Sequence, residues 1–281
     1  MSSATLPARM RLAVNSDCTS CIDLAAGISL AIALDLQGEQ PRHFDAPPAR
    51  STPYVVGAFN GEVARGASCN CRSVTLIPHC NGTHTEGVGH LTRDCPPLHA
   101  VIPIQPMAAL VLSLQAETVP LSEEDSLPAP QAGDLLLTRR SLLAAWPQDL
   151  PWQPQVLVLR TLPNSPDKCT RDYSSLNPPY LSRQLVDELV ARGIEHLITD
   201  LPSIDRSHDE GLLTAHRLFF GLPAGSCEWA DAARSQATVT ELAYIAEHIS
   251  DGPCAVQLQV PAWSGDALPS RPVLFRLMET S

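Results

Sequence analysis

Aromatic residues and long apolar runs are both scarce in this chain of 281 residues. Aromatics make up only 5% of the chain while 44% is hydrophobic, so leucine, valine, isoleucine and alanine must build most of any core. A membrane-spanning helix needs about 20 consecutive apolar residues. The best candidate, Leu24–Leu34, is too short and is followed by Asp35. We therefore expect no association with a membrane.

Positive charge is also scarce. The chain has 19 Lys and Arg against 30 Asp and Glu, a net charge of −11, and no stretch is rich in Lys or Arg. A chain of this sign repels phosphate backbones, which excludes nucleic acid as an expected partner. Phosphate-binding glycine loops, dinucleotide fingerprints and the Gly-x-Ser-x-Gly elbow are missing as well. These absences favour a small-molecule substrate without a nucleotide cofactor.

Residues 1–10 lack the apolar stretch of a signal peptide, and we predict that they form a flexible tail. The nine cysteines are odd in number, which is typical of a reduced, cytoplasmic protein. The pairs Cys18/Cys21 and Cys69/Cys71 do not have the matched spacing of a zinc knuckle. We expect Cys69 and Cys71 to be small buried hydrophobic residues.

One segment carries a clear strand–helix–strand pattern. Gln155–Arg160 is an apolar run that predicts a buried strand. Ser182–Arg192 has apolar residues at helical spacing, and Gly193 is suited to end that helix. Ile194–Thr199 predicts the next strand. This order indicates an α/β unit.

The rest of the chain predicts short strands joined by loops. Residues 40–53 contain four prolines and are expected to be irregular, and residues 119–134 predict a surface insertion. We interpret residues 11–281 as a single domain. Further strands are expected at Cys21–Asp35, Ser73–Pro78, Ala109–Leu114, Val239–Ala246 and Ala255–Val260, and a strand or a pair of short helices at Asp134–Trp146.

The densest group of reactive side chains lies between His79 and His90, which hold three His, one Glu and one Cys in twelve residues. If this segment is extended, His84 and Glu86 project from the same face, because side chains in a strand alternate. Imidazole and carboxylate together suit zinc or manganese, and the soft thiol of Cys80 favours zinc. The pattern predicts a metal site.

These residues resemble a known signature. His79, Gly82-Thr83-His84-Thr85-Glu86 and His90 are similar to the His-x-Gly-Thr-His-x-Asp-x-Pro-x-His motif of the cyclase/kynurenine formamidase superfamily of metal-dependent hydrolases. The resemblance covers roughly residues 25–275 in the family's order. Its later elements match Thr199–Asp205, His216–Gly221, Thr240–Leu242 and Ala267–Val273.

The resemblance implies a fold and a site. The fold would be α/β, a single mixed domain with a curved, barrel-like β-sheet and flanking helices, in a dimer or higher homo-oligomer. The site would hold one or two divalent ions, Zn²⁺ first and Mn²⁺ second. His90 would be the catalytic general base, and the metal ligands would be His79, His84, Glu86, His216 and Glu241.

The sequence departs from the family pattern at four points, one of which is Val88 where the motif has Pro. Glu86 stands where the family has Asp. The family's spacing places the first ligand at Cys80, and we favour His79 beside it. The usual spacing after His216 leads to Glu228, and we favour Glu241 because Thr-Glu-Leu reproduces its surroundings. Asp200 and Asp205 are interpreted as structural groups that accept backbone N–H bonds.

Two functions are consistent with this pattern. The first is hydrolysis of a C–N bond in an amide, a cyclic amide or a formamide, the last as in an arylformamidase of tryptophan catabolism. The reaction would use a metal-activated water with a His base. The second is a lyase-like cyclase or a metal-binding member without hydrolytic turnover, which the altered ligand set would favour.

Overall fold

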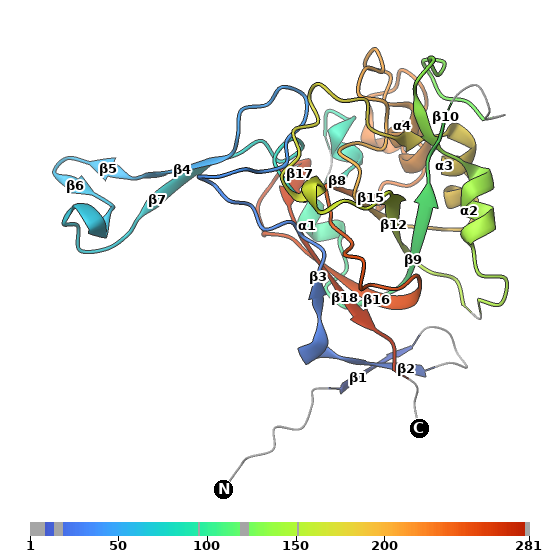
Figure 1. Ribbon diagram of the computed structural model, residues 1–281, viewed down its shortest axis with the longest axis horizontal. Coiled ribbons are helices and arrows are strands. Elements are labelled where there is room, and N and C mark those ends of the chain that lie inside the picture. The colour runs from blue at the N-terminus through green and yellow to red at the C-terminus, as the bar shows by residue number, and fades with distance from the viewer. Residues whose placement is uncertain (1–8, 14–18, 95, 119–123, 151, 279–281) are drawn as a thin grey trace, which may run out of the picture.

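A computed structural model of the chain describes residues 9–13, 19–94, 96–118, 124–150 and 152–278. At its centre is a strongly curved mixed sheet of nine strands in the order β17-β8-β15-β14-β12-β9-β16-β18-β3 (Figure 1). Its strands are β3 (Ile28–Ser29), β8 (His84–Gly87), β9 (Met107–Gln115), β12 (Val156–Leu162), β14 (His196–Thr199), β15 (Thr238–Glu241), β16 (Gly252–Gln259), β17 (Ala267–Pro269) and β18 (Arg271–Arg276).

The middle of the sheet is parallel. β15, β14, β12 and β9 run in the same direction, and the strands outside them pair antiparallel. In β9, Leu110 and Leu112 contribute to one core cluster and Ala109 and Val111 to another. Both faces of the parallel strands are therefore buried, which explains why their sequences are almost continuously apolar.

Three helices form a layer over one face of this sheet (Figure 1). Helix α3 begins after Ser182, whose hydroxyl accepts a hydrogen bond from the Leu185 N–H at 3.1 Å, and it ends before Gly193, which has a φ of 69°. The strand–helix–strand unit predicted from the sequence is confirmed. The helices are α1 (Leu98–Val101), α2 (Arg139–Ala145), α3 (Arg183–Ala191) and α4 (Thr214–Phe220), of which α2, α3 and α4 form the layer.

Shorter strands form four small sheets around the main one. Two of these sheets build a projecting arm, defined here as residues 50–75, which extends far from the body (Figure 1). The small sheets pair β1 (Arg9–Ala13) with β2 (Thr19–Asp23), β4 (Arg50–Pro53) with β7 (Arg72–Thr75), and β5 (Val55–Val56) with β6 (Phe59–Asn60), and they join β10 (Glu117–Thr118), β11 (Leu135–Leu137) and β13 (Tyr180–Leu181).

The observed architecture confirms the α/β fold class, a mixed domain with a curved sheet and flanking helices. The tail predicted at residues 1–10 lies outside the described residues up to residue 8, and β1 begins at Arg9. Residues 124–134 are irregular, and 119–123 lie outside the described part of the chain. The interpretation of residues 11–281 as one domain with an insertion stays a prediction. The described residues contain no helix long and apolar enough to cross a membrane.

Three sequence expectations were wrong. Cys21–Asp35 is not one buried strand, because β3 lies at the sheet edge and pairs with only two residues of β18. The proline-rich segment 40–53 ends in the regular strand β4. Cys69 and Cys71 are exposed, because the arm has no core beneath it. An apolar run without periodicity does not distinguish a core strand from an edge segment.

Candidate metal centre

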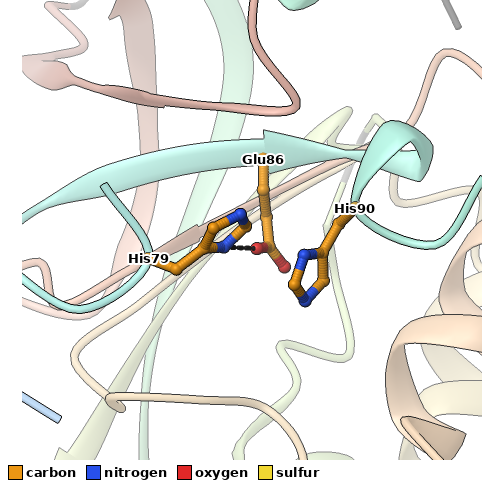
Figure 2. Close-up of side chains that lie close together, drawn as sticks. All are labelled: His79, Glu86 and His90. Carbon is orange, nitrogen blue, oxygen red and sulfur yellow. Dashed lines mark ion pairs between the residues drawn. The ribbon is translucent and has the colours of Figure 1, made fainter. Parts of the chain in front are cut away.

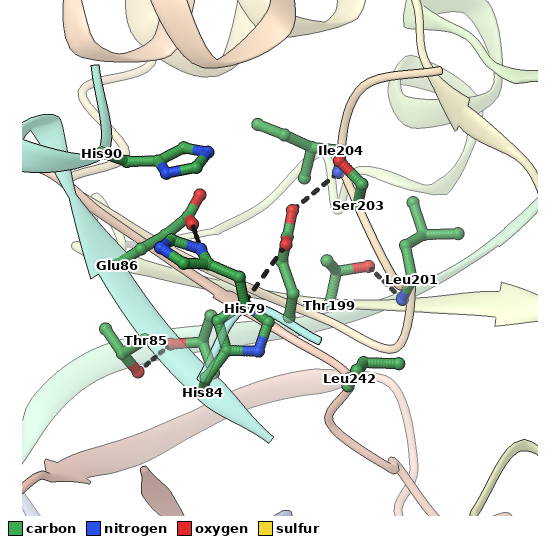
Figure 3. Close-up of polar contacts among 12 residues, drawn as sticks. His79, His84, Thr85, Glu86, His90, Thr199, Leu201, Ser203, Ile204 and Leu242 are labelled. Carbon is green, nitrogen blue, oxygen red and sulfur yellow. Dashed lines mark hydrogen bonds and ion pairs between the residues drawn. The ribbon is translucent and has the colours of Figure 1, made fainter. Parts of the chain in front are cut away.

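The centre is built on β8, which lies between β17 and β15. All four of its residues are buried, and because side chains alternate along a strand, His84 and Glu86 share one face. Thr85 points to the other face, where its hydroxyl lies 2.7 Å from that of Thr240 (Figure 3). The extended conformation expected around His84 is confirmed. A strand that buries an imidazole and a carboxylate on one face needs groups that compensate their desolvation.

His79 and His90 both lie next to Glu86 (Figure 2). His79 precedes the strand, and its Nδ1 lies 2.7 Å from Glu86 Oε2. His90 follows in the 3₁₀ turn Val88–His90, and its ring centroid lies 4.1 Å from that of His79. The close pair of histidines is a consequence of the turn, which brings the chain back beside the strand.

The second half of the chain adds His216 and Glu241. His216, from α4, contacts Glu86 Oε1 through Nε2 and lies 3.5 Å from Glu241 Oε1. Glu241 ends β15, and its Oε2 lies 3.4 Å from His84 Nε2. The structure therefore brings together all six side chains selected from the sequence. Their individual roles stay predictions.

The two alternative ligands lie elsewhere. Glu228 is on the surface, where its side chain is 59% exposed and forms an ion pair with Arg93. Cys80 is buried, and its carbonyl accepts a hydrogen bond from the His43 N–H at 3.2 Å. Neither belongs to a group of side chains that could share an ion among the described residues.

Two carboxylates hold the histidines from outside. Asp205 Oδ2 lies 2.6 Å from His216 Nδ1, and the Asp205 carboxylate also accepts the backbone N–H of Ala215 and of His216, so it caps α4 and orients the ring. This agrees with its structural interpretation. Asp266 Oδ2 lies 2.8 Å from His79 Nε2 and 3.7 Å from His90 Nδ1. No motif marks Asp266, because only the pairing of β17 with β8 brings it there.

The backbone also supports the buried carboxylates. The Ile204 N–H donates to Glu241 Oε1 at 2.7 Å (Figure 3). Ile204 lies in the loop after β14, next to the segment that holds Asp205. Asp200, at the start of this loop, accepts the Thr161 N–H and the ammonium of Lys168, as its structural interpretation predicted.

The cluster strongly favours positive charge on two of its imidazoles, those of His79 and His216. Burial lowers the pKa of His79, but hydrogen bonds to Asp266 and Glu86 outweigh burial and raise it to about 10. Burial likewise lowers the pKa of His216, and the Glu86 charge raises it well above its usual value. Burial raises the pKa of Glu86, yet the charges of His216 and His90 hold it well below normal. Protonated imidazoles thus balance the negative charge of the buried carboxylates, as a metal cation would.

The geometry fits a divalent ion. Two groups of side chains have ligand atoms within 4.8 Å of one another: His79, Glu86 and His90, and His84, Glu86 and Glu241. Glu86 belongs to both, so it could bridge two ions. Within the described chain, the buried atoms His84 Nε2, Glu86 Oε1 and His216 Nε2 face one another and Glu241 as ion pairs. Buried imidazole nitrogens and carboxylate oxygens that face one another in this way are the donor set that divalent ions such as zinc prefer.

Comparisons with known proteins agree with this arrangement. A family model described as "Putative cyclase" matches residues 22–206, more than half of the chain. The solved structure of a "predicted metal-dependent hydrolase" from Bacillus stearothermophilus has a TM-score of 0.55 at 12% identity, covering 89% of this chain and 97% of that chain. A search of curated proteins returned no match.

Two further solved structures are isatin hydrolases. Isatin hydrolase A from Labrenzia aggregata has a TM-score of 0.58 at 13% identity, covering 90% of this chain and 96% of that one. Isatin hydrolase A from Ralstonia solanacearum has a TM-score of 0.57 at 13% identity, covering 89% and 91%. Identities this low establish a shared fold. The matched family segment contains His79, His84, Glu86 and His90, while His216 and Glu241 lie beyond it.

Proposed function

The chain belongs to the cyclase family, and from this premise we propose that it is a metal-dependent hydrolase that cleaves a C–N bond. The observation that carries the proposal is the cluster around Glu86, in which imidazole and carboxylate ligand atoms lie within 4.8 Å of one another in two groups that share Glu86. The solved neighbours named isatin hydrolases support an amide substrate, because isatin is a cyclic amide. We propose a cyclic amide, a formamide or a simple amide as substrate.

The buried side chains of the cluster and its partly exposed side chains would have different roles. His84, Glu86, His216 and Glu241 are buried and would hold the metal with His79. The side chains of His79 and His90 are 23% and 25% exposed, and that of Asp266 is 50% exposed, so the substrate would enter from their side. A bound divalent ion lowers the pKa of a coordinated water toward neutrality and polarises a carbonyl. We propose zinc, with manganese second, in one or two positions.

His90 would act as the general base. An imidazole exchanges a proton readily near neutral pH and is the commonest group in this role. Asp266 lies on the Nδ1 side of His90, which leaves Nε2 as the atom to take a proton and return it to the leaving nitrogen. The competing role for His90 is that of a third imidazole ligand, since it lies in the same group as His79 and Glu86.

A second candidate function is a lyase-like cyclase or a metal-binding protein without hydrolysis. The longer Glu86 side chain in place of Asp favours it, because one added methylene moves the carboxylate relative to any ion. Elemental analysis of protein purified without chelator, followed by assays on N-formyl-kynurenine, isatin and small cyclic amides, separates the two. Hydrolysis of N-formyl-kynurenine would support an arylformamidase of tryptophan catabolism. Bound metal without turnover on any of them would favour the second function, and no metal after reconstitution would refute both.

We also propose a cytoplasmic location. Cysteines distributed over the described residues are all free, including the exposed Cys69 and Cys71 on the arm. Exposed thiols persist in a reducing compartment.

The arm supports a homo-oligomer as the working form of the protein. Among residues 50–75 only Gly61 is buried, while Val55, Val56 and Val74 are 62%, 54% and 53% exposed. A two-stranded ribbon without a core beneath it is barely stable in water. The arm has three Arg and one Glu, a sign opposite to the net charge of the whole chain, −11. We propose that the arm packs on a second copy of this chain.

The base of the arm connects assembly to the metal centre. The segments on either side of the arm are joined where the His43 N–H donates to the Cys80 carbonyl and where Asn81 Nδ2 donates to the Pro47 carbonyl. His79 lies immediately before this junction. Packing of the arm against a second chain would therefore also steady His79.

A further inference from the structure

A cavity of about 350 Å³ lies beside the metal centre and is not part of it. Its walls include Gln115, Thr161 and Asp200, which come from the carboxyl ends of the parallel strands β9, β12 and β14. Ligands of α/β proteins bind in the crevice outside the carboxyl ends of such strands. β12 lies two strands from β15, about 10 Å at the usual strand spacing. The volume is within the range of small-molecule sites.

The cavity walls are mostly apolar. Leucine and proline side chains offer an apolar surface on which an aromatic ring can pack. Proline side chains also lose little conformational entropy when a ligand binds. Burial raises the pKa of Tyr173, so its phenol stays neutral and available as a hydrogen-bonding group. The apolar part of the lining consists chiefly of four leucines and four prolines, among them Leu162, Leu176, Leu201, Pro163, Pro178 and Pro202.

Both cations in the cavity wall already have carboxylate partners. The Lys168 ammonium is buried, and it donates to Asp200 Oδ2 at 2.8 Å and to the Thr161 carbonyl at 2.7 Å and hydroxyl at 2.9 Å. Arg171 forms an ion pair with Asp167. An anionic ligand would have to compete with these carboxylates for the two cations. The side chains that line the cavity therefore favour an uncharged aromatic ligand over a charged one.

The loop between the cavity and the metal centre contacts both. Leu201 lines the cavity, and its carbonyl accepts the Leu242 N–H at 2.8 Å, one residue after Glu241. Ile204, three residues further on, donates its N–H to Glu241 Oε1 at 2.7 Å. Asp205 then orients His216. Residues 200–205 thus form a wall of the cavity at one end and a support of the metal ligands at the other.

We propose that this cavity binds an uncharged aromatic small molecule, and that the bound ring steadies residues 200–205. The binding step rests on the cavity alone. The link to the metal centre rests on the proposed function, and it makes metal and ring ligand favour each other, because coupling between two sites is reciprocal.

The test uses 2-naphthol as the probe and 2-naphthoate as its charged counterpart, titrated calorimetrically into metal-free protein. We expect one saturable site for 2-naphthol and an affinity at least about tenfold lower for 2-naphthoate, because a carboxylate loses hydration without gaining a free cation. Leu176→Trp and Ala116→Trp should each remove binding by filling the cavity. Leu24→Trp is the matched control, since Leu24 is 43% exposed and Leu176 45%.

Hydrogen exchange supplies the second readout. Saturation with 2-naphthol should slow exchange of the backbone N–H groups of Leu201 and of residues 203–205 by about fivefold or more, and Leu24→Trp should behave in the same way. Absence of saturable binding, a preference for 2-naphthoate, or unchanged binding in both filled variants would overturn the site. Binding without slower exchange at 201–205 would overturn the coupling. Because binding is measured without metal, a protein inactive on every amide would still decide this proposal.

Discussion

Two antiparallel strand pairs of equal length differ in how far their side chains are buried. The pair β8–β15 has four residues on each side and buries every one of them, including His84, Glu86 and Glu241. The pair β4–β7 also has four residues on each side, yet every residue of β7 is exposed, including Val74. One pair buries ionisable side chains, and the other leaves its one valine, Val74, exposed to water.

Both departures have a physical cost that points to a missing partner. Buried carboxylates and imidazoles are unfavourable unless paired or bound to a metal. An exposed valine forgoes roughly 1.5–3 kcal/mol that full burial would contribute. We propose that an ion completes the buried polar strand pair, and that another protein surface covers the exposed valines of the arm. Four changes test this difference, given from the largest expected effect to the smallest.

Replacing His84 by Ala should have the largest effect. The variant loses a buried imidazole of the group that also contains Glu86 and Glu241, so we expect loss of bound metal, loss of detectable activity and a lower melting temperature of the reconstituted protein. Elemental analysis and thermal denaturation measure this. His248→Ala, at an exposed position, should retain metal and stability. Full metal content in His84→Ala would contradict its role as a ligand.

His90→Ala should lose activity without losing the bound metal. We expect metal content and melting temperature to stay near those of the parent protein, with kcat lower by roughly 10² to 10⁴, the usual contribution of a general base. Steady-state kinetics on the best amide substrate together with metal stoichiometry give the answer. Metal lost along with activity would assign His90 as a ligand instead.

Introducing negative charge on the arm should weaken the association of two chains. The chain has a mass of 30.2 kDa, and we expect light scattering to give at least twice that value. Val55→Asp with Val56→Asp should raise the dissociation constant by about 100-fold or more, because charge is poorly tolerated in an interface core. Ile104→Asp, at a residue 84% exposed on the body, should leave the mass unchanged. A mass near 30 kDa for the parent protein would exclude the oligomer.

Asp266→Asn should have the smallest effect and concerns pH. The pKa of His79 is raised from 6.5 to about 10 in the folded, metal-free protein. The stabilisation is therefore complete below pH 6.5 and is lost as pH rises toward 10. We expect the free energy of unfolding to fall across this window, and to fall less in Asp266→Asn.

Urea unfolding at several pH values measures this slope. Asp187→Asn, an exposed carboxylate on α3, is the control and should keep the parent slope. We also expect Asp266→Asn to weaken metal binding by about 10- to 100-fold, the usual effect of a group that orients a ligand. An unchanged slope in Asp266→Asn would mean that Asp266 does not set the His79 pKa.

Local patterns predicted the parts of the fold that depend on near neighbours. The helix after Ser182 and the shared face of His84 and Glu86 follow from spacing along a few residues, and both are present. The prediction of a buried strand at Cys21–Asp35 was wrong because the apolar residues of this run have no periodicity. Nothing local distinguishes an edge segment from a core strand in such a run. The arm was missed for a related reason, since Ser73–Pro78 alternates like any half-buried strand.

Sequence alone therefore determined which residue types could bind a metal and which of them share a strand face. It named the remote residues His216 and Glu241 only through the family resemblance, and nothing in it indicated Asp266. Glu241 reaches His84 because β15 pairs with β8, and Asp266 reaches His79 because β17 pairs with the other edge of β8. Strand pairing depends on the burial of whole faces over long chain separations. Only the tertiary structure brought those carboxylates to the histidines, and only it left the valines of the arm in water.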